Sequence, residues 1–354
     1  MSETGNPYRG LPDSQFWRRA VSGIERHRLD PVVNPKFTIS RTARIATAGS
    51  CFAQHISRKL MSVGFNYFVS EDAPELDAAT RKARNYGTFT ARFGDIYTTR
   101  QLLQLFLRAF GHFDPQEQAW QRPDGRFVDP YRPNVEPDGY NTPAAVRHWL
   151  GVHLTAVRQM FHQCDVFVFT MGLTEGWRSR IDGAVFPLAP GVVAGEFDAE
   201  RHEFVNFGVH ENEADMSEFL ERLRKINPRA KVLLTVSPVP LIATYEPRHV
   251  LVSTTYSKSV LRVAAESMQR AYPWVDYFPS YEIITGSFNG GIYYQPDFRE
   301  VTEAGVAHAM RCFTRNYLEE QQRTVAPKPV SIPLDTAPRP DLICDEEALD
   351  QIRG

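Results

Sequence analysis

Short, nearly continuous apolar runs recur along the chain, and segments with helical periodicity separate them. The runs lie at residues 44–48, 165–171, 231–237 and 275–284, and a further strand is expected at 64–69. Apolar runs that alternate with helical patterns are typical of a parallel sheet that helices cover on both faces. The chain is therefore predicted to be an α/β protein with a mostly parallel sheet.

Helices are expected to follow these strands. Every fourth residue from Phe52 to Leu60 is apolar, as on the buried face of a helix. Ser257 is a candidate N-cap for the helix that follows it, and Thr302 is a candidate N-cap for the last helix. In the last helix, His308 falls about 200° from the apolar stripe and is expected to face solvent.

Two insertions interrupt the alternating pattern. Residues 85–163 carry helices of their own, expected at 99–110 and 144–162. Residues 180–210 contain the turn pair Asp182-Gly183 between short apolar runs, which predicts a hairpin. Insertions of this kind often form part of a binding pocket.

The pattern also divides the chain into an arm, a domain and a tail. Residues 1–42 are expected to form an arm packed on the domain, which spans residues 43–320. Residues 321–354 are rich in proline and polar side chains, so they are predicted to be a flexible tail.

Composition and charge narrow the functional classes. The 354 residues are 42% hydrophobic and 23% charged, with a net charge of −2, so nothing in the overall charge favours nucleic acid as a partner. Without an apolar run of about 18 residues or a secretory signal, no membrane span is expected and a cytoplasmic location is predicted.

The sequence predicts no oligomeric state. The cysteines are widely spaced, so neither disulfides nor a zinc site is expected; they are Cys51, Cys164, Cys312 and Cys344.

The candidate chemistry lies where strands end, because ligands of parallel α/β sheets bind at the carboxyl ends of the strands. Gly49, Ser50 and Cys51 follow the first run. The glycine permits a tight turn into a helix, whose N-terminal N–H groups stabilise an anion and lower the pKa of a thiol. Cys51 and Ser50 are therefore candidate nucleophiles. A serine N-cap followed by a buried cysteine is the structural alternative.

Such a nucleophile needs a base and an acid that orients the base. His249, in the loop after the 231–237 run, is the predicted base. His55 is the rival, because it follows Cys51 by four residues on the same side of a helix. Further polar residues near strand ends are candidates for orienting the base or binding substrate: Thr174, Glu175, Lys258, Tyr281 and Glu282. A solvated turn is the alternative for Thr174 and Glu175.

Motifs for other chemistries are missing. The chain has no phosphate loop, no dinucleotide-binding glycine motif and no zinc-protease motif, so no cofactor or metal is predicted. Aromatic residues make up 12% of the chain, and many of them, including Trp177, fall in expected loops. Aromatic faces beside Arg and Asp suit a carbohydrate ligand, and cover for the core is the alternative.

Several long motifs resemble the GSCFA domain family. GSCFA itself stands at residues 49–53, and further similar stretches lie at 85–105, 169–177, 234–244, 249–262 and 277–286. The likeness covers most of residues 5–318. The family resembles a branch of the SGNH/GDSL hydrolase-like superfamily. This resemblance implies a flavodoxin-like, three-layer α/β/α sandwich.

The resemblance also implies roles for single residues. Gly49-Ser50-Cys51 resembles the superfamily's Gly-Asp-Ser block, which places Cys51 at the nucleophile, or Ser50 if the alignment shifts by one. Gly87 resembles the oxyanion glycine of the second block, and Thr174 stands in place of the oxyanion asparagine. The last block departs from the pattern: residues 297–300 carry Glu300 where the superfamily has its histidine. The base is therefore expected from elsewhere, with His249 as the candidate.

Two functional hypotheses follow. The first is an esterase or O-acyltransferase that acts on a sugar or polysaccharide hydroxyl, with a Cys or Ser nucleophile and a histidine base. It requires no cofactor, and acyl-CoA is a candidate acyl donor. The alternative is a non-catalytic protein that binds a glycan or a protein partner on the same scaffold, since fold alone does not fix function.

Overall fold

Four parallel strands form the centre of the structure, a computed structural model that describes residues 6–319. The strands are β1 (Ile45–Gly49), β4 (Val166–Met171), β8 (Lys231–Val236) and β9 (Val275–Tyr277), and they lie in the order β1-β4-β8-β9. The pairing places Gly49 beside Thr170, and Thr170 beside Thr235. The carboxyl ends of β1, β4 and β8 therefore meet at one edge of the sheet. The predicted tail at 321–354 lies outside the described residues.

Two predicted strands differ from the structure. Residues 64–69 contribute only a single parallel bridge, between Tyr67 and Ile45 at the sheet edge. The expected run at 275–284 is wrong in its second half, where β9 ends at Tyr277 and the helix α7 (Ser280–Thr285) begins. Pro279 lacks the backbone N–H that a continued strand would need, so the chain turns there.

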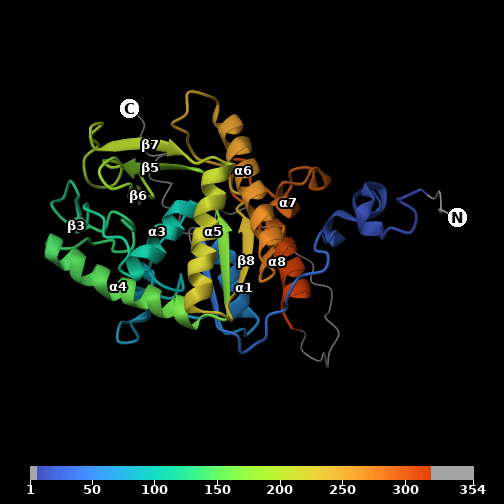
Figure 1. The fold of residues 1–354 in the computed structure, drawn as a ribbon, viewed down its shortest axis with the longest axis horizontal. Helices are drawn as coiled ribbons and strands as arrows, with labels where there is room; N and C mark the ends of the chain where they lie inside the picture. The colour runs from blue at the N-terminus through green and yellow to red at the C-terminus, as the bar shows by residue number, and fades with distance from the viewer. Residues whose placement is uncertain (1–5, 320–354) are drawn as a thin grey trace.

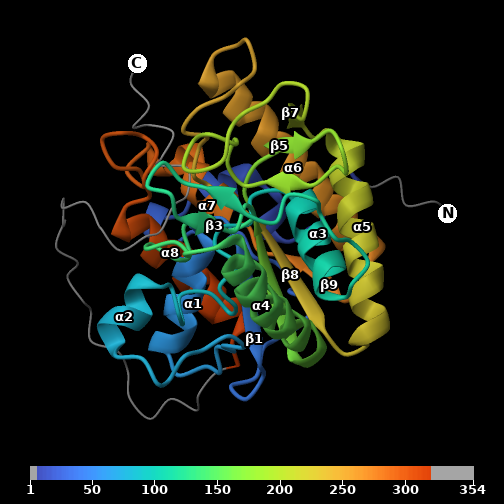
Figure 2. The ribbon, with the colours of Figure 1, turned by 90° about the vertical axis from the view of Figure 1, so that its left-hand side faces the viewer.

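Helices cover both faces of the sheet, which confirms the three-layer α/β/α sandwich (Figures 1 and 2). Val166 and Val168 face one layer, and Phe167 and Phe169 face the other, because side chains alternate along a strand. The first layer holds α1 (Ala53–Ser62), α7 and α8 (Glu303–Tyr317). The second holds α3 (Thr99–Ala109), α4 (Pro143–Gln163), α5 (Val209–Ile226) and α6 (Val250–Ala271).

The insertions form the predicted elements. Helices α3 and α4 confirm the two helices expected within residues 85–163, which also hold a two-stranded ribbon of β2 (Trp120–Gln121) and β3 (Phe127–Val128). The hairpin at Asp182-Gly183 joins β5 (Glu175–Ser179) to β6 (Val185–Phe186), and β7 (His202–Asn206) completes an antiparallel sheet in the order β6-β5-β7. This small sheet starts directly after β4, at the edge where the carboxyl ends of the strands meet. Helix α2 is Ala78–Ala83.

Two predictions are wrong: the N-cap role of Ser257 and the exposure of His308. Helix α6 begins at Val250, and Ser257 lies buried inside it instead of capping it. His308 is buried, not solvent-facing, because the arm and the loop before α8 cover that side of the helix. Its two ring nitrogens lie 2.6 Å from the Tyr293 hydroxyl and from the carbonyl oxygen of Leu29. Thr302 caps α8 as predicted.

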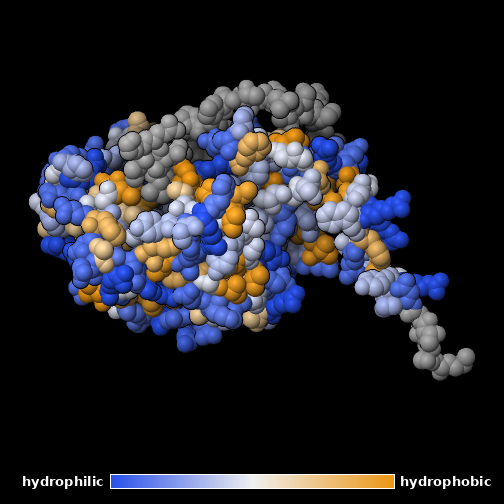
Figure 3. Space-filling model, turned by 90° about the horizontal axis from the view of Figure 1, so that it is seen from above, coloured by the Kyte–Doolittle hydropathy of each residue, from blue (hydrophilic) through white to orange (hydrophobic). Residues whose placement is uncertain are grey.

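The arm packs on the domain over its second half. Phe37 and Ile39 join the core beside α8, and Ile39 forms a parallel bridge with Leu318. Short helical turns at Asp13–Gln15, Arg18–Ser22 and Arg26–Arg28 precede this segment and project from the body in Figure 1. On the face drawn in Figure 3, hydrophobic residues form small separate patches among hydrophilic ones. Scattered patches of this size are normal on a folded protein.

Candidate functional site

A strained glycine begins the turn from β1 into α1, which we call the β1 exit (residues 49–53). Gly49 has φ +134°, a value that L side chains rarely adopt. A Cβ at this position would overlap the carbonyl oxygen of Thr170 and lie 2.7 Å from its backbone nitrogen. The backbone N–H of Ser50 donates to the same carbonyl at 3.2 Å. Only glycine fits this approach, so the exit is locked against β4.

A second glycine packs against the exit from the end of β4. A Cβ on Gly172 would lie 3.2 Å from the Cβ of Ser50 and 3.1 Å from the carbonyl oxygen of Tyr97. The Gly172 N–H donates to that Tyr97 carbonyl at 3.0 Å, and the Ile96 N–H donates to the Gly49 carbonyl at 2.9 Å. The ends of β1 and β4 and the 96–97 segment therefore interlock around Ser50.

Two buried hydroxyl groups, one in the β1 exit and one on the neighbouring strand β4, lack hydrogen-bond partners among the described residues. They are Ser50 Oγ and Thr170 Oγ1, and both residues are less than 5% exposed. Buried polar atoms are normally paired, so each exception calls for an explanation, such as a ligand or an ordered water. Sequence reasoning missed Thr170. The signal was a lone hydroxyl at the end of an otherwise apolar strand.

Lys258 approaches the same place from α6. Its side chain is 1% exposed, and its Nζ donates to the carbonyl oxygen of Gly172 at 2.7 Å. The preceding residue, Ser257, accepts a hydrogen bond from the Thr174 N–H at 3.0 Å. Helix α6 thus fixes the loop that follows β4. The predicted residues Ser50 and Lys258 therefore both lie next to Gly172, Ser50 beside its Cα and Lys258 at its carbonyl oxygen.

Cys51 lies in the turn just before α1, and His55 lies in the first turn of α1. Both are buried, and the His55 ring packs against the Phe52 ring at 5.3 Å between centroids. The other two described thiols, those of Cys164 and Cys312, are part of the core, and burial raises the pKa of each to about 12. Among the three described cysteines, Cys51 is the one at a strand exit. Cys344 lies outside the described residues.

The predicted base and its two candidate carboxylates are not joined to one another. His249 is exposed and caps α6, with its Nδ1 accepting from the Leu251 N–H at 3.1 Å. The carboxylate of Glu175 accepts from the Thr244 hydroxyl at 2.7 Å. Burial raises the pKa of Glu175. Glu282 accepts from Arg262 Nε at 2.7 Å and from the Tyr277 hydroxyl at 2.8 Å. Within the described range, neither carboxylate hydrogen-bonds to a histidine.

The remaining candidate residues, including the two candidate oxyanion residues Thr174 and Gly87, lie in separate surroundings. The hydroxyl of buried Thr174 donates to Asn206 at 2.7 Å. Gly87, at φ +76°, lines a pocket of about 300 Å³ beside Gln54 and Ser57 on α1. Burial raises the pKa of the half-buried Tyr281. The residues 297–300 form an exposed turn in which Asp297 accepts from the backbone of Glu300 at 3.1 Å.

The comparisons with known proteins agree with the motifs. The GSCFA family matches residues 44–313, from the start of β1 into α8. The chain belongs to the GSCFA family. No curated protein matches this GSCFA chain. Across residues 6–319, none of its helices has both the length and the apolar character that crossing a bilayer requires.

Four aromatic rings form a surface cluster beside Glu175 in this GSCFA protein. We call it the aromatic platform: Trp177, Phe197, Phe204 and Tyr245. The Tyr245 ring lies 4.8 Å from the Trp177 ring and 5.3 Å from the Phe204 ring, between centroids. Tyr245 is 65% exposed, and its backbone N–H donates to Glu175 at 3.3 Å. Phe197 and Tyr245 are the more exposed members of the platform, so aromatic surface is open to solvent beside β5, the strand that follows β4.

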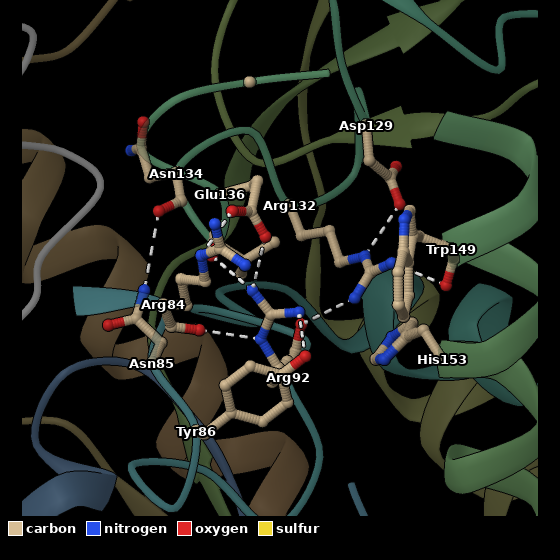
Figure 4. A network of polar contacts seen from close by, with 12 residues as sticks. Arg84, Asn85, Tyr86, Arg92, Asp129, Arg132, Asn134, Glu136, Trp149 and His153 are labelled. Carbon is tan, nitrogen blue, oxygen red and sulfur yellow. Dashed lines mark hydrogen bonds and ion pairs between the residues drawn. The ribbon is translucent and has the colours of Figure 1, made fainter. Parts of the chain in front are cut away.

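A buried ion network ties the 85–163 insertion to the domain (Figure 4). Arg132 donates from Nε to Asp129 at 2.8 Å, and its Nη1 lies 3.7 Å from Glu71. Glu71 also lies 2.7 Å from His153 Nδ1 and accepts from the Arg92 N–H. All five side chains are at least nine-tenths buried. Sequence reasoning missed this network, because each charge alone resembles a surface residue.

The charges in the network are matched. Burial alone would raise the pKa of Glu71, but His153 and Arg132 together lower it to about 2. Burial lowers the pKa of His153, and Arg132 adds to that effect. Asp129 keeps a lowered pKa because Arg132 and Arg108 outweigh its burial. Paired and hydrogen-bonded charges of this kind are typical of a structural element.

Proposed function

We propose that this GSCFA protein catalyses acyl transfer to a sugar or polysaccharide hydroxyl, or to water, with Ser50 or Cys51 as the nucleophile. The observation that supports this most is the β1 exit. Two glycines, Gly49 and Gly172, hold Ser50 at the edge where the carboxyl ends of the strands meet, and its buried hydroxyl has no described partner. This edge is where parallel α/β sheets bind their ligands.

The reaction would proceed in two displacements. The nucleophile attacks the acyl carbonyl, the bond to the leaving group breaks, and the leaving group takes the proton that the nucleophile gave up. A sugar hydroxyl or water then attacks the acyl carbonyl of the acyl-enzyme, and the bond between the acyl carbon and the nucleophile breaks. The proton of the acceptor returns to the nucleophile, and the acylated sugar or the free acid leaves. Backbone N–H groups at the start of α1 would stabilise the oxyanion, as unpaired helix N-termini can.

Three residues are candidates for the base. Lys258 is a candidate base for Ser50, because both residues contact Gly172 and serine-lysine pairs are an established variant of nucleophilic catalysis. A lysine acts as a base only when neutral, and burial favours its neutral form. His55, four residues after Cys51 and in the first turn of α1, is the candidate base for Cys51. His249 would have to leave its capping position to act.

The aromatic platform supports a carbohydrate acceptor. Ring faces such as those of Trp177 and Tyr245 can stack on the apolar faces of sugar rings, and nearby polar groups can fix orientation. Glu175 provides such a group, since it accepts from the backbone of Tyr245. Trp177 lies on β5, the strand that follows β4 in the chain.

Turnover of acylated sugars and of acyl-CoA with glycan acceptors, followed by mass spectrometry, tests this function. We expect Ser50→Ala or Cys51→Ala, whichever removes the nucleophile, to lower kcat by at least about 10³-fold. Lys258→Met, His55→Gln and His249→Gln identify the base by the same loss. Cys312→Ala is the matched control, because that thiol is buried away from the exit. Unchanged turnover in both nucleophile variants would overturn the proposal.

A non-catalytic binding protein is the second candidate. The turn at residues 297–300 supports it, because Glu300 stands where the resembled superfamily has a histidine. A binding protein would retain glycan affinity in Ser50→Ala and Cys51→Ala and lose it in Trp177→Ala and Tyr245→Ala. It would show no turnover with any donor.

A further inference from the structure

A groove of about 890 Å³ runs between α1 and α8, outside the β1 exit. His55 and Glu303, near the starts of the two helices, and Ser62 and Leu318, at or just after their ends, line the groove. Helices α1 and α8 pack against each other. A groove of this volume can hold a ligand of the size of a nucleotide cofactor.

The charged side chains along the groove are mostly basic. The cationic ones are Arg41, Arg58, Lys59, Arg311 and Arg315. Only two carboxylates, Glu303 and Glu319, line the same groove among the described residues. The whole chain has a net charge of −2, so this excess of positive charge is local. A cleft lined by one sign of charge concentrates ligands of the opposite sign.

The groove is also partly apolar. Phe65, Val306 and Met310 contribute hydrocarbon surface between the basic residues. The Arg41 guanidinium lies over the Phe65 ring at 5.3 Å, which holds a cation beside that surface. Anionic groups alone would not need such a lining. A ligand that combines phosphates with an aliphatic arm would use both kinds of surface.

One residue of the groove lies close along the chain to the candidate nucleophiles. His55 lines the groove and follows Cys51 by four residues, in the first turn of the helix that begins at the end of the β1 exit. A ligand lying along the groove could therefore place a reactive end at the β1 exit and its charged part further along the two helices.

We propose that the groove binds the acyl donor as an acyl-coenzyme A, which rests on the proposed function. The phosphates would contact the basic residues, the pantetheine arm would lie on Phe65 and Met310, and the thioester would reach the β1 exit. Cys51 or Ser50 attacks the thioester carbonyl, and the carbon–sulfur bond to coenzyme A breaks. Coenzyme A leaves as the thiol, with the proton that the nucleophile gave up.

Binding of coenzyme A to the full chain, measured by titration calorimetry, tests this site without any turnover. We expect Lys59→Glu and Arg41→Glu each to weaken binding at least tenfold, with a stronger loss in the double variant and a fall in affinity as salt rises. Lys225→Glu, an equal charge change on α5 in the other helix layer, is the matched control and should bind as the parent does. Ala307→Trp, which fills the groove without changing charge, should also abolish binding.

Ligand fragments decide what the groove recognises. Adenosine 3′,5′-bisphosphate should bind more weakly than coenzyme A, and the groove variants should weaken both. If heparin or inorganic polyphosphate binds as tightly as coenzyme A and pantetheine adds nothing, the groove is a general polyanion site and the proposal is wrong. Unchanged coenzyme A affinity in the groove variants, or none in the parent, also overturns it.

The two proposals fail separately. If the parent binds coenzyme A, the groove variants do not, and no acyl transfer occurs under any condition, the groove proposal stands and the catalytic function is rejected. Ester turnover that depends on Cys51 or Ser50, without affinity for coenzyme A, would keep the function and reject the groove.

Discussion

The β1 exit and the buried ion network are both deep and polar, yet they are built in opposite ways. In the network, Arg132, Glu71, Asp129 and His153 satisfy one another, and the pKa of Glu71 falls to about 2. At the exit, the Ser50 hydroxyl is buried without a described partner beside a strained glycine. Matched charges hold a structure together, whereas an unmatched group at a strand end is available to a ligand.

The comparison also limits what a perturbed pKa means. Shifted pKa values cluster at functional sites, but structural ion pairs shift them as well. In this protein the lowered pKa of Glu71 belongs to a carboxylate with partners on several sides. The unpaired hydroxyl and the backbone strain at the exit are therefore the better guides to a reactive site.

Gly49→Ala should have the largest effect. The new Cβ would overlap Thr170, so the exit cannot form without moving β1 or β4. We expect a loss of more than about 4 kcal/mol in the free energy of unfolding, or no folded protein at all. Gly87→Ala is the control: this glycine also has a positive φ, of +76°, but open space around it, and its replacement should cost only about 1 kcal/mol. Equal losses in urea denaturation would refute the locked exit.

Arg132→Met should cause the next largest loss of stability. It leaves Asp129 and Glu71 buried with one fewer cation, and breaking a buried ion pair from one side typically costs about 3–5 kcal/mol. Arg270→Met removes an exposed partner of Glu266 and should change stability by less than about 1 kcal/mol. Similar midpoints for the two variants in chemical denaturation would show that the network is not structural.

The pH dependence of stability should follow from the same network. The pKa of Glu71 is lowered to about 2 in the folded state, so its contribution is present above about pH 4.5 and is lost as the pH falls toward 2. His153 also has a lowered pKa, so acid below its usual value of 6.5 favours the unfolded chain. The free energy of unfolding should fall between pH 5 and pH 3, and we expect this fall to be roughly 2 kcal/mol smaller in Glu71→Gln than in the parent. Parallel stability curves for parent and variant would contradict this assignment.

Ser50→Ala should have the smallest effect on stability. The hydroxyl has no described partner, so its loss removes no hydrogen bond, and replacing a buried unpaired polar group can be neutral or stabilising. We expect a change within about 0.5 kcal/mol, and the same for Thr170→Val. Thr235→Val is the control, because that hydroxyl bonds to the Phe278 carbonyl at 2.7 Å. A loss above about 1.5 kcal/mol in Ser50→Ala would reveal a structural role.

Much of the fold follows from local sequence patterns. Strands β1, β4 and β8 and helices α3, α4 and α8 lie close to their predicted positions, since burial on both faces leaves a clear apolar run. The start of α6 was missed because His249, an uncommon N-cap, takes the place expected for Ser257. The burial of His308 was missed because it depends on Leu29, far away in the sequence.

The candidate site was predictable only in part. The glycine and the two nucleophiles of the β1 exit stand together in the sequence, so their location at a strand end was predictable. The approach of Lys258 to Gly172 depends on how α6 packs, and no local pattern reports it. The surroundings of His249, Glu175 and Glu282 likewise depend on contacts between distant segments.

Covalent trapping tests the nucleophile at the β1 exit most directly. The full chain is incubated with an acyl-CoA or a p-nitrophenyl ester, quenched in acid, digested and mapped by mass spectrometry. We predict an acyl group on Cys51 or Ser50 that disappears when that residue is replaced by alanine. An acyl group found only at other residues, or turnover that continues undiminished in both alanine variants, would contradict the assignment of the exit as the catalytic centre.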